Sequence, residues 1–189
     1  MDKVKHLMVD LETLSTSSHA AITQIGACFF DIKNGRIHQT FKVDVFPDFE
    51  KYDVSFSTIK WWMQQSDEAR DSVFGDGVER VSMGTAAVEL NAFISAVVPS
   101  DWELRVWAMP AAFDVVILEN AFVTENFPVP WKYNASRDVR TIMEVASFGK
   151  SDRVEPEVAH DALSDAVAQA KTVSKAWRSI KETPKKRKT

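Results

Sequence analysis

Two carboxylates stand two residues apart inside the first apolar stretch of the chain. The stretch runs from His6 to Leu14, and as a β-strand it would place Asp10 and Glu12 on one face. Like charges side by side repel and raise each other's pKa unless a cation lies between them. Hard divalent ions such as Mg²⁺ or Mn²⁺ prefer oxygen ligands of this kind. The sequence therefore predicts a strand that carries metal ligands.

Two later segments supply further acidic residues. Asp114 follows Ala112 and Phe113, and Asp165 ends the segment that starts at His160. With the two acids of the first strand they would complete a cage of four carboxylates. Such a cage around two divalent ions is typical of phosphodiester cleavage.

Each motif also has a structural explanation when it is read alone. Asp114 or His160 could cap a helix, and the Asp10-Leu11-Glu12 segment could be a solvated strand end. Asp165 lies among apolar residues at helical spacing, and such a helix needs no acid to fold. The functional interpretation is favoured because all five residues occur in the required order within one modest chain.

The ordered motifs resemble those of the DEDDh branch of the DnaQ-like 3′→5′ exonucleases, which have a ribonuclease-H-like fold. The histidine five residues before the last acid has the spacing of that branch. A second segment is similar to phage and prophage exonucleases of the exonuclease VIII-like or ribonuclease AS-like group: Thr58-Ile59-Lys60-Trp61-Trp62, Gln65-Ser66 and Glu68-Ala69-Arg70. The resemblance covers roughly Lys5 to Trp177.

The resemblance implies a metal-dependent 3′→5′ exonuclease that releases nucleoside 5′-monophosphates. Its substrate would be a single strand of RNA or DNA with a free 3′ end. Two Mg²⁺ or Mn²⁺ ions, about 4 Å apart, would be held by the four acids, Asp10, Glu12, Asp114 and Asp165. His160 would accept a proton from the attacking water, since neutral imidazole titrates near pH ~6.5.

Substrate contacts are expected next to these ligands. Thr13 and Leu14 would hold the terminal nucleotide, and Trp61 and Trp62 would stack on bases. Adjacent helical residues point in different directions, so at most one of the two tryptophans can face the groove. The chain departs from its relatives before Asp114, where Ala108-Met109-Pro110-Ala111 replaces a small polar stretch; this departure concerns nucleotide contacts and not the metal ligand.

Net charge argues against a general binder of polyanions. The formal charge is −4, and without the four cations of the C-terminal tail the rest holds 19 basic against 27 acidic residues, or −8. An exonuclease holds only a strand end, and its ions cancel the charge of the cage and the scissile phosphate. An acidic body is therefore compatible with a local nuclease site.

Two other classes of function remain open at this point. One is a non-catalytic nucleic-acid-binding or scaffold domain that keeps the exonuclease fold, which the intact ligands disfavour and the Met109-Pro110 loop favours. The other is a ribonuclease-H-like endonuclease, which the histidine spacing disfavours. No residue pattern separates RNA from DNA as substrate. Related DEDDh enzymes are often dimers, so a homodimer is one assembly to test.

The predicted fold class is α/β, with a ribonuclease-H-like fold and a mixed five-stranded sheet flanked by helices. The Asn34-Gly35 pair predicts a hairpin turn. Four strands are expected over Lys5–Leu14, Ala20–Ile32, Arg36–Val45 and Arg105–Ala108. Helices are expected over Ser57–Gln65, Ser66–Ser72, Thr85–Val97, from Asp114, from Asp138 through Phe148, and from the His160 segment to about Lys181.

Length and composition indicate one domain. The chain has 189 residues and 45% hydrophobic content, which suffices for one core. We expect an exonuclease domain over residues 1–182 and a disordered basic tail over residues 183–189. We also expect a cytoplasmic protein, because the N-terminus has no signal-peptide pattern and no apolar run is long enough to span a membrane. The single cysteine, Cys28, is predicted to fill the core.

Overall fold

A five-stranded mixed sheet forms the centre of the molecule. The computed structural model describes residues 3–182, and its strands lie in the order β3-β2-β1-β4-β5. β2 pairs antiparallel with both β1 and β3, whereas β4 runs parallel to β1 and β5. The strands are β1 (Val4–Thr13), β2 (Ile22–Phe30), β3 (Ile37–Asp44), β4 (Glu103–Ala108) and β5 (Ser136–Asp138).

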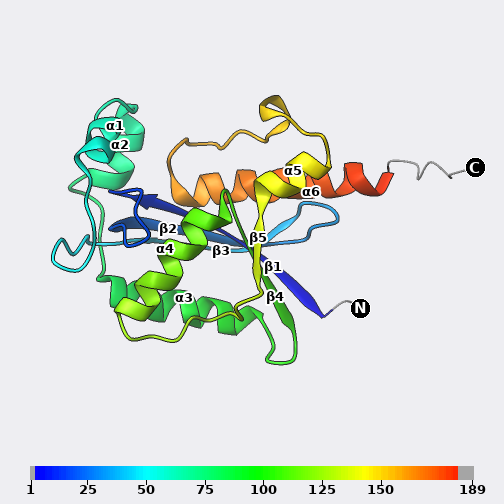
Figure 1. Cartoon of the computed structure of the whole chain (residues 1–189), viewed down its shortest axis with the longest axis horizontal. Helices are drawn as coiled ribbons and strands as arrows, with labels where there is room; N and C mark the ends of the chain where they lie inside the picture. Colours follow the sequence, from blue (N-terminus) through cyan, green and yellow to red (C-terminus); the bar gives the residue numbers. More distant parts are fainter. Residues whose placement is uncertain (1–2, 183–189) are drawn as a thin grey trace, which may run out of the picture.

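Helices cover both faces of this sheet (Figure 1). One layer holds α3 (Met83–Val97) and α4 (Ala111–Thr124), and the opposite layer holds α5 (Val139–Val145) and α6 (Ala162–Glu182). Two short helices, α1 (Phe56–Trp62) and α2 (Asp67–Phe74), lie at the left end of the view. A 3₁₀ turn spans Lys150–Asp152. No helix within the described residues is long and apolar enough to cross a membrane.

The central strand β1 is buried on both faces, and its alternation divides the core into two clusters. Leu7, Val9 and Leu11 belong to the cluster under α3 and α4. Met8 belongs to the cluster under α5 and α6. Because side chains alternate along a strand, the even-numbered acids of β1 share the α6 side with Met8. The cluster on this side also contains Cys28, whose burial fits its predicted core role.

The predicted α/β fold and its mixed five-stranded sheet are confirmed, with strand ends shifted by up to two residues. The hairpin turn is also as predicted: Gly35 adopts a φ of 75°, which a residue without a Cβ reaches easily, and donates from its N–H to Asp31 O (2.8 Å). The fifth strand, β5, had no assigned range, because Ser136–Asp138 has only three residues and none is apolar. The predicted basic tail, residues 183–189, lies outside the described residues.

Candidate active site

Two buried acids on β1 form the base of the site. Asp10 is 9% exposed and Glu12 is 7% exposed, and both lie on the α6 side of the sheet. They stand opposite Gly26 and Gln24 on β2. The predicted pair of carboxylates on one strand face is therefore present, and neither is a solvated strand end.

Asp114 reaches the site from the first turn of α4. The strand pairing leaves room for this side chain. β4 pairs with β1 only as far as Met8, so the backbone of β1 beyond that point lacks a neighbour on the β4 side. The Leu11 N–H donates instead to Asp114 Oδ1 (3.2 Å). Asp114 is 3% exposed, and the first N–H of the helix, that of Ala111, donates to Asp138 Oδ2 (2.8 Å). The carboxylate thus bonds to the sheet and does not serve as the helix cap.

The last two site residues come from the start of α6. His160 has a left-handed backbone (φ 61°), and its N–H donates to Asp165 Oδ2 (2.8 Å). Asp161 Oδ1 accepts from the Ser164 N–H (3.0 Å), so Asp161 rather than His160 caps the helix. This arrangement turns the His160 side chain out of the helix register while tying its backbone to Asp165.

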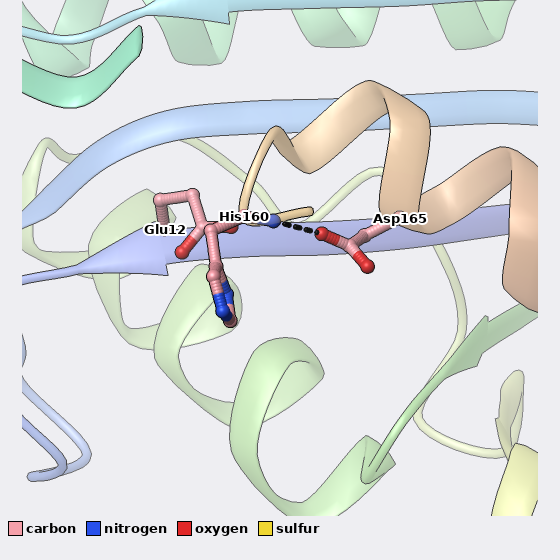
Figure 2. A group of neighbouring side chains, drawn as sticks. All are labelled: Glu12, His160 and Asp165. Carbon is pink, nitrogen blue, oxygen red and sulfur yellow. Dashed lines mark hydrogen bonds between the residues drawn. The ribbon is translucent and has the colours of Figure 1, made fainter. Parts of the chain in front are cut away.

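Glu12, His160 and Asp165 converge from segments far apart in the sequence. One ligand atom from each lies within 4.8 Å of the others. Figure 2 shows the three side chains together, with the backbone of His160 hydrogen-bonded to Asp165. His160 and Asp165 are both half-buried, which leaves this side of the site open to solvent.

A glycine on β2 allows α6 to come this close to the sheet. A Cβ built on Gly26 would lie 2.1 Å from the carbonyl carbon of Ala162 and 2.3 Å from Leu163 N. Any other residue would push the first turn of α6 away from the sheet. Since Gly26 pairs with Asp10, this contact holds Asp165 over the carboxylates of β1.

Two glutamines, which the sequence analysis did not identify, position the acids. Gln169 Nε2 donates to Asp10 Oδ1 (2.6 Å), and Gln24 Oε1 accepts from the Ala162 N–H (2.7 Å). Gln169 lies one helical turn after Asp165, a spacing that places both on one face and could have revealed it. Gln24 had no such local signal, because its role follows from strand pairing.

The carboxylates of the site repel one another when no cation is bound. Burial raises the pKa of Asp10 and Glu12 well above the usual range of carboxyl groups, and neighbouring acids raise it further. Burial raises the pKa of Asp114 to about 7, although backbone hydrogen bonds partly offset the effect. The pKa of Asp165 is also raised, mainly by burial. Four acids with raised pKa values in one place are suited to bind divalent cations.

The predicted substrate residues differ in exposure. Trp62 is only 1% exposed and donates from Nε1 to Thr13 O (3.0 Å), so it is a core residue and not the base-stacking residue predicted from the sequence. Trp61 is 42% exposed, and its ring meets the His160 ring edge-on with 4.9 Å between centroids. Thr13 and Leu14 are buried beside Glu12 at 7% and 3% exposure.

The known proteins that this chain resembles include several nucleases. The exodeoxyribonuclease of Enterobacteria phage T4 is 28% identical over 189 residues, a match that covers 84% of this chain and 82% of the phage protein. The zinc-bound complex of E. coli exonuclease I with single-stranded DNA has a similar fold, with a TM-score of 0.68 and 14% identity. That match covers 96% of this chain but 41% of the exonuclease I chain, so this chain spans less than half of its length.

A second structural match has nearly the same length. The nuclease domain of 3′hExo, a DEDDh family member bound to rAMP, matches with a TM-score of 0.60 and 10% identity, over 92% of each chain. The family model described as a 3′-5′ exoribonuclease Rv2179c-like domain matches residues 5–177. Because this match spans most of the sequence, the chain belongs to the Rv2179c-like family of 3′-5′ exoribonuclease domains, and the exonuclease resemblance inferred from its motifs is confirmed.

Proposed function

We propose that this chain cleaves single-stranded nucleic acid from a free 3′ end and releases nucleoside 5′-monophosphates, using two divalent ions in a domain that spans residues 1–182. The observation that supports this function most directly is the convergence of Glu12, His160 and Asp165 within 4.8 Å, next to buried Asp10. An acidic cluster of this kind has no value for packing, since it costs free energy when its charges are uncompensated.

The acids would hold the ions, and His160 would handle the proton. Mg²⁺ or Mn²⁺ on the four carboxylates would activate a water and neutralise the charge that develops on the scissile phosphate. His160 would take the proton of the attacking water, because a nitrogen of its half-buried ring lies within 4.8 Å of the carboxylates of Glu12 and Asp165. Gln169 would keep Asp10 in one orientation during this step.

Trp61 is the residue best suited to meet the terminal nucleotide. Its exposed ring stands against His160, so a base that stacks on it would lie beside the acids. Thr13 and Leu14 would close the other side of this nucleotide. Both sugars stay in the proposal, because the matching family is described as exoribonucleases and the phage relative is an exodeoxyribonuclease.

We place the protein in the cytoplasm and propose that it forms a homodimer. The single cysteine, Cys28, is fully buried, which is compatible with a compartment without disulfide formation. Sedimentation velocity would measure the oligomeric state directly.

A cleavage assay with labelled strands tests the proposed polarity. Single-stranded RNA and DNA oligonucleotides labelled at the 3′ or the 5′ end are incubated with Mn²⁺ or with EDTA. We expect early release of label as mononucleotide from the 3′ end only, no cleavage in EDTA, and resistance of a circular single strand. Rapid nicking of the circle would indicate an endonuclease, and no cleavage of any strand would favour the non-catalytic binding domain.

The first prediction separates the roles of Asp10 and His160. Asp10→Ala should abolish both metal binding and turnover, because it removes a buried ligand. His160→Ala should keep metal binding and lower kcat by roughly 10²–10⁴-fold, the usual contribution of a general base. Titration calorimetry with Mn²⁺ measures binding beside the kinetics. Equal loss of metal in both variants would make His160 a ligand, which its distance from Glu12 and Asp165 also permits.

A further inference from the structure

A cavity lies at the opposite end of the sheet from the acids. Its volume is about 690 Å³, within the range of roughly 300–1,000 Å³ found for small-molecule sites. His6 of β1 and Trp177 of α6 both line it. His6 precedes Asp10 by four residues, or about 13 Å along the strand. In Figure 1 this region is on the right, where β1 begins and α6 ends. None of the five proposed catalytic residues lines it.

Aromatic side chains form much of the cavity wall. Trp102 and Trp177 are half-buried, while Phe30 and Trp107 are buried. The Lys5 ammonium lies over the Trp102 ring (5.1 Å to its centre) and the Lys181 ammonium over the Trp177 ring (5.0 Å), so a base would replace these cations or stack on the opposite ring face. Nucleic-acid bases stack on such rings with little dependence on sequence, because every base has a π-face. The wall therefore suits a flat aromatic ligand.

The cavity lining is basic, whereas the molecule as a whole is acidic. The whole chain carries a net charge of −4, but the cavity lining contains one acid, Asp31, and four basic residues: Lys5, Lys33, Arg105 and Arg137. Arg105 pairs with Glu103, which does not line the cavity. Arg137 donates only to the backbone oxygens of Asn134 and Ser136 and forms no ion pair with a carboxylate of residues 3–182. A cluster of cations of this kind attracts an anion, and arginine suits phosphate best.

His6 adds a neutral donor to the cavity. Trp107 Nε1 donates to His6 Nδ1 (3.0 Å), and an indole N–H cannot accept, so the neutral imidazole carries its proton on Nε2. Burial, with Arg105 and Arg137 nearby, lowers the pKa of His6 to about 4, whereas Asp31 acts in the opposite direction. At neutral pH this side chain thus offers a fixed N–H donor.

We propose that this cavity is a second nucleotide site, which binds an aromatic base bearing a phosphate group. The aromatic wall would hold the base, and Arg137 with Lys5 would hold the phosphate. The nucleotide could be a free mononucleotide or one residue of a longer strand, because both present the same chemistry. Binding here needs no divalent ion, so it stands independently of the function proposed for the acids.

Binding of adenosine 5′-monophosphate in EDTA tests the site without the metal centre. We expect Arg137→Gln, which removes the charge but keeps side-chain donors, to weaken binding by about tenfold, as loss of a charged hydrogen-bond partner does. Arg178→Gln is the matched control, since Arg178 is exposed on α6 and does not line the cavity. Lys5→Gln provides a second test if Arg137→Gln melts early. Adenosine and ribose 5-phosphate should each bind more weakly than the intact nucleotide.

Photo-crosslinking locates the ligand, and binding of oligonucleotides of different lengths distinguishes a free mononucleotide from one residue of a longer strand. With 8-azidoadenosine 5′-monophosphate in EDTA, labelled peptides should contain Trp102, Trp107 or Trp177. Single-stranded oligonucleotides from about 4 to about 16 nucleotides, the range of known single-strand site sizes, should bind more tightly with length only if the cavity holds part of a strand. The proposal is overturned if neither ligand binds in EDTA, if Arg137→Gln and Lys5→Gln both match Arg178→Gln, or if the label lies only on the peptide with His160.

Discussion

At the scale of single residues, uncharged side chains position the charged ones. Gln169 bonds to Asp10, and Gln24 bonds to the start of α6. The Gln169 Oε1 atom is buried and has no hydrogen-bond partner within the described residues. A leucine of similar size would remove this unsatisfied oxygen but also the hydrogen bond to buried Asp10, so the two effects on stability oppose each other. The retention of Gln169 in the core points to a role in orienting Asp10.

We therefore predict that Gln169→Leu damages the site and not the fold. Metal affinity or turnover should fall by about 10–100-fold, as is usual when a residue that orients a metal ligand is lost. The melting temperature without metal should stay near that of the original protein. Gln64→Leu, at an exposed position, is the control. Calorimetric titration with Mn²⁺ and steady-state kinetics check both effects, and unchanged metal affinity would remove Gln169 from the list of positioning residues.

His6 should make stability depend on pH. Its pKa is about 4 in the folded protein and near 6.5 when unfolded, mainly because of burial. The unfolded chain therefore binds a proton more readily between these values, and stability that is present above pH 6.5 is lost as the pH falls towards 4. At about 1.4 kcal/mol per pKa unit, the loss reaches up to about 3 kcal/mol.

His6→Asn should remove this dependence while it keeps an acceptor for the Trp107 N–H. Urea unfolding from pH 4 to pH 7.5 measures the free energy of unfolding for both proteins. His38→Asn is the control, because His38 is exposed. The prediction fails if the difference between His6→Asn and the original protein is the same at both ends of this range.

At the scale of elements, the sequence predicted the helices and strands whose apolar residues recur at a regular spacing. It did not predict contacts between residues far apart in the sequence. The strands and α6 were predictable, since their apolar residues recur at a regular spacing, and the convergence of Glu12, His160 and Asp165 was expected from the order of their motifs. β5 has no such pattern, and only its pairing with β4 identifies it as a strand. The contact of Gly26 with Ala162 joins residues 136 positions apart, so no local pattern could indicate it.

Gly26→Ala should therefore displace α6 from the sheet. Its Cβ would overlap the backbone of Ala162 at 2.1 Å, and backbone cannot rotate away as a side chain can. We expect a large loss of metal affinity and activity, together with a destabilisation of roughly 1–3 kcal/mol from overpacking. Gly77→Ala is the control, because a Cβ there meets no atom within 4 Å. Full activity of Gly26→Ala would mean that α6 can shift without moving Asp165.

At the scale of the whole molecule, the acids should make stability depend on metal. Without ions, the buried carboxylates repel one another, and a ligand that binds only the folded state stabilises it by about 2.7 kcal/mol at 100 times its Kd. For a chain of this size that corresponds to a rise in Tm of about 5–10 °C.

Asp10→Asn provides the contrast for this measurement. It should melt at or above the original protein in EDTA, because one buried charge is gone while Gln169 keeps an acceptor. It should also show little response to Mn²⁺. Differential scanning calorimetry of both proteins, with and without Mn²⁺, makes the comparison. A metal-free Asp10→Asn that melts well below the original protein would mean that repulsion among the acids is minor.

The bond between Asp114 and the Leu11 N–H has an evolutionary consequence. This carboxylate occupies the place that a longer β4 would fill, so its loss would leave a buried donor without a partner. The carboxylate of Glu12 accepts no hydrogen bond from any of residues 3–182, and mutation there leaves no such gap. In a lineage that gave up cleavage but kept the fold, selection should remove Glu12 before Asp114. An aspartate at position 114 alone would then be a poor marker of an active relative.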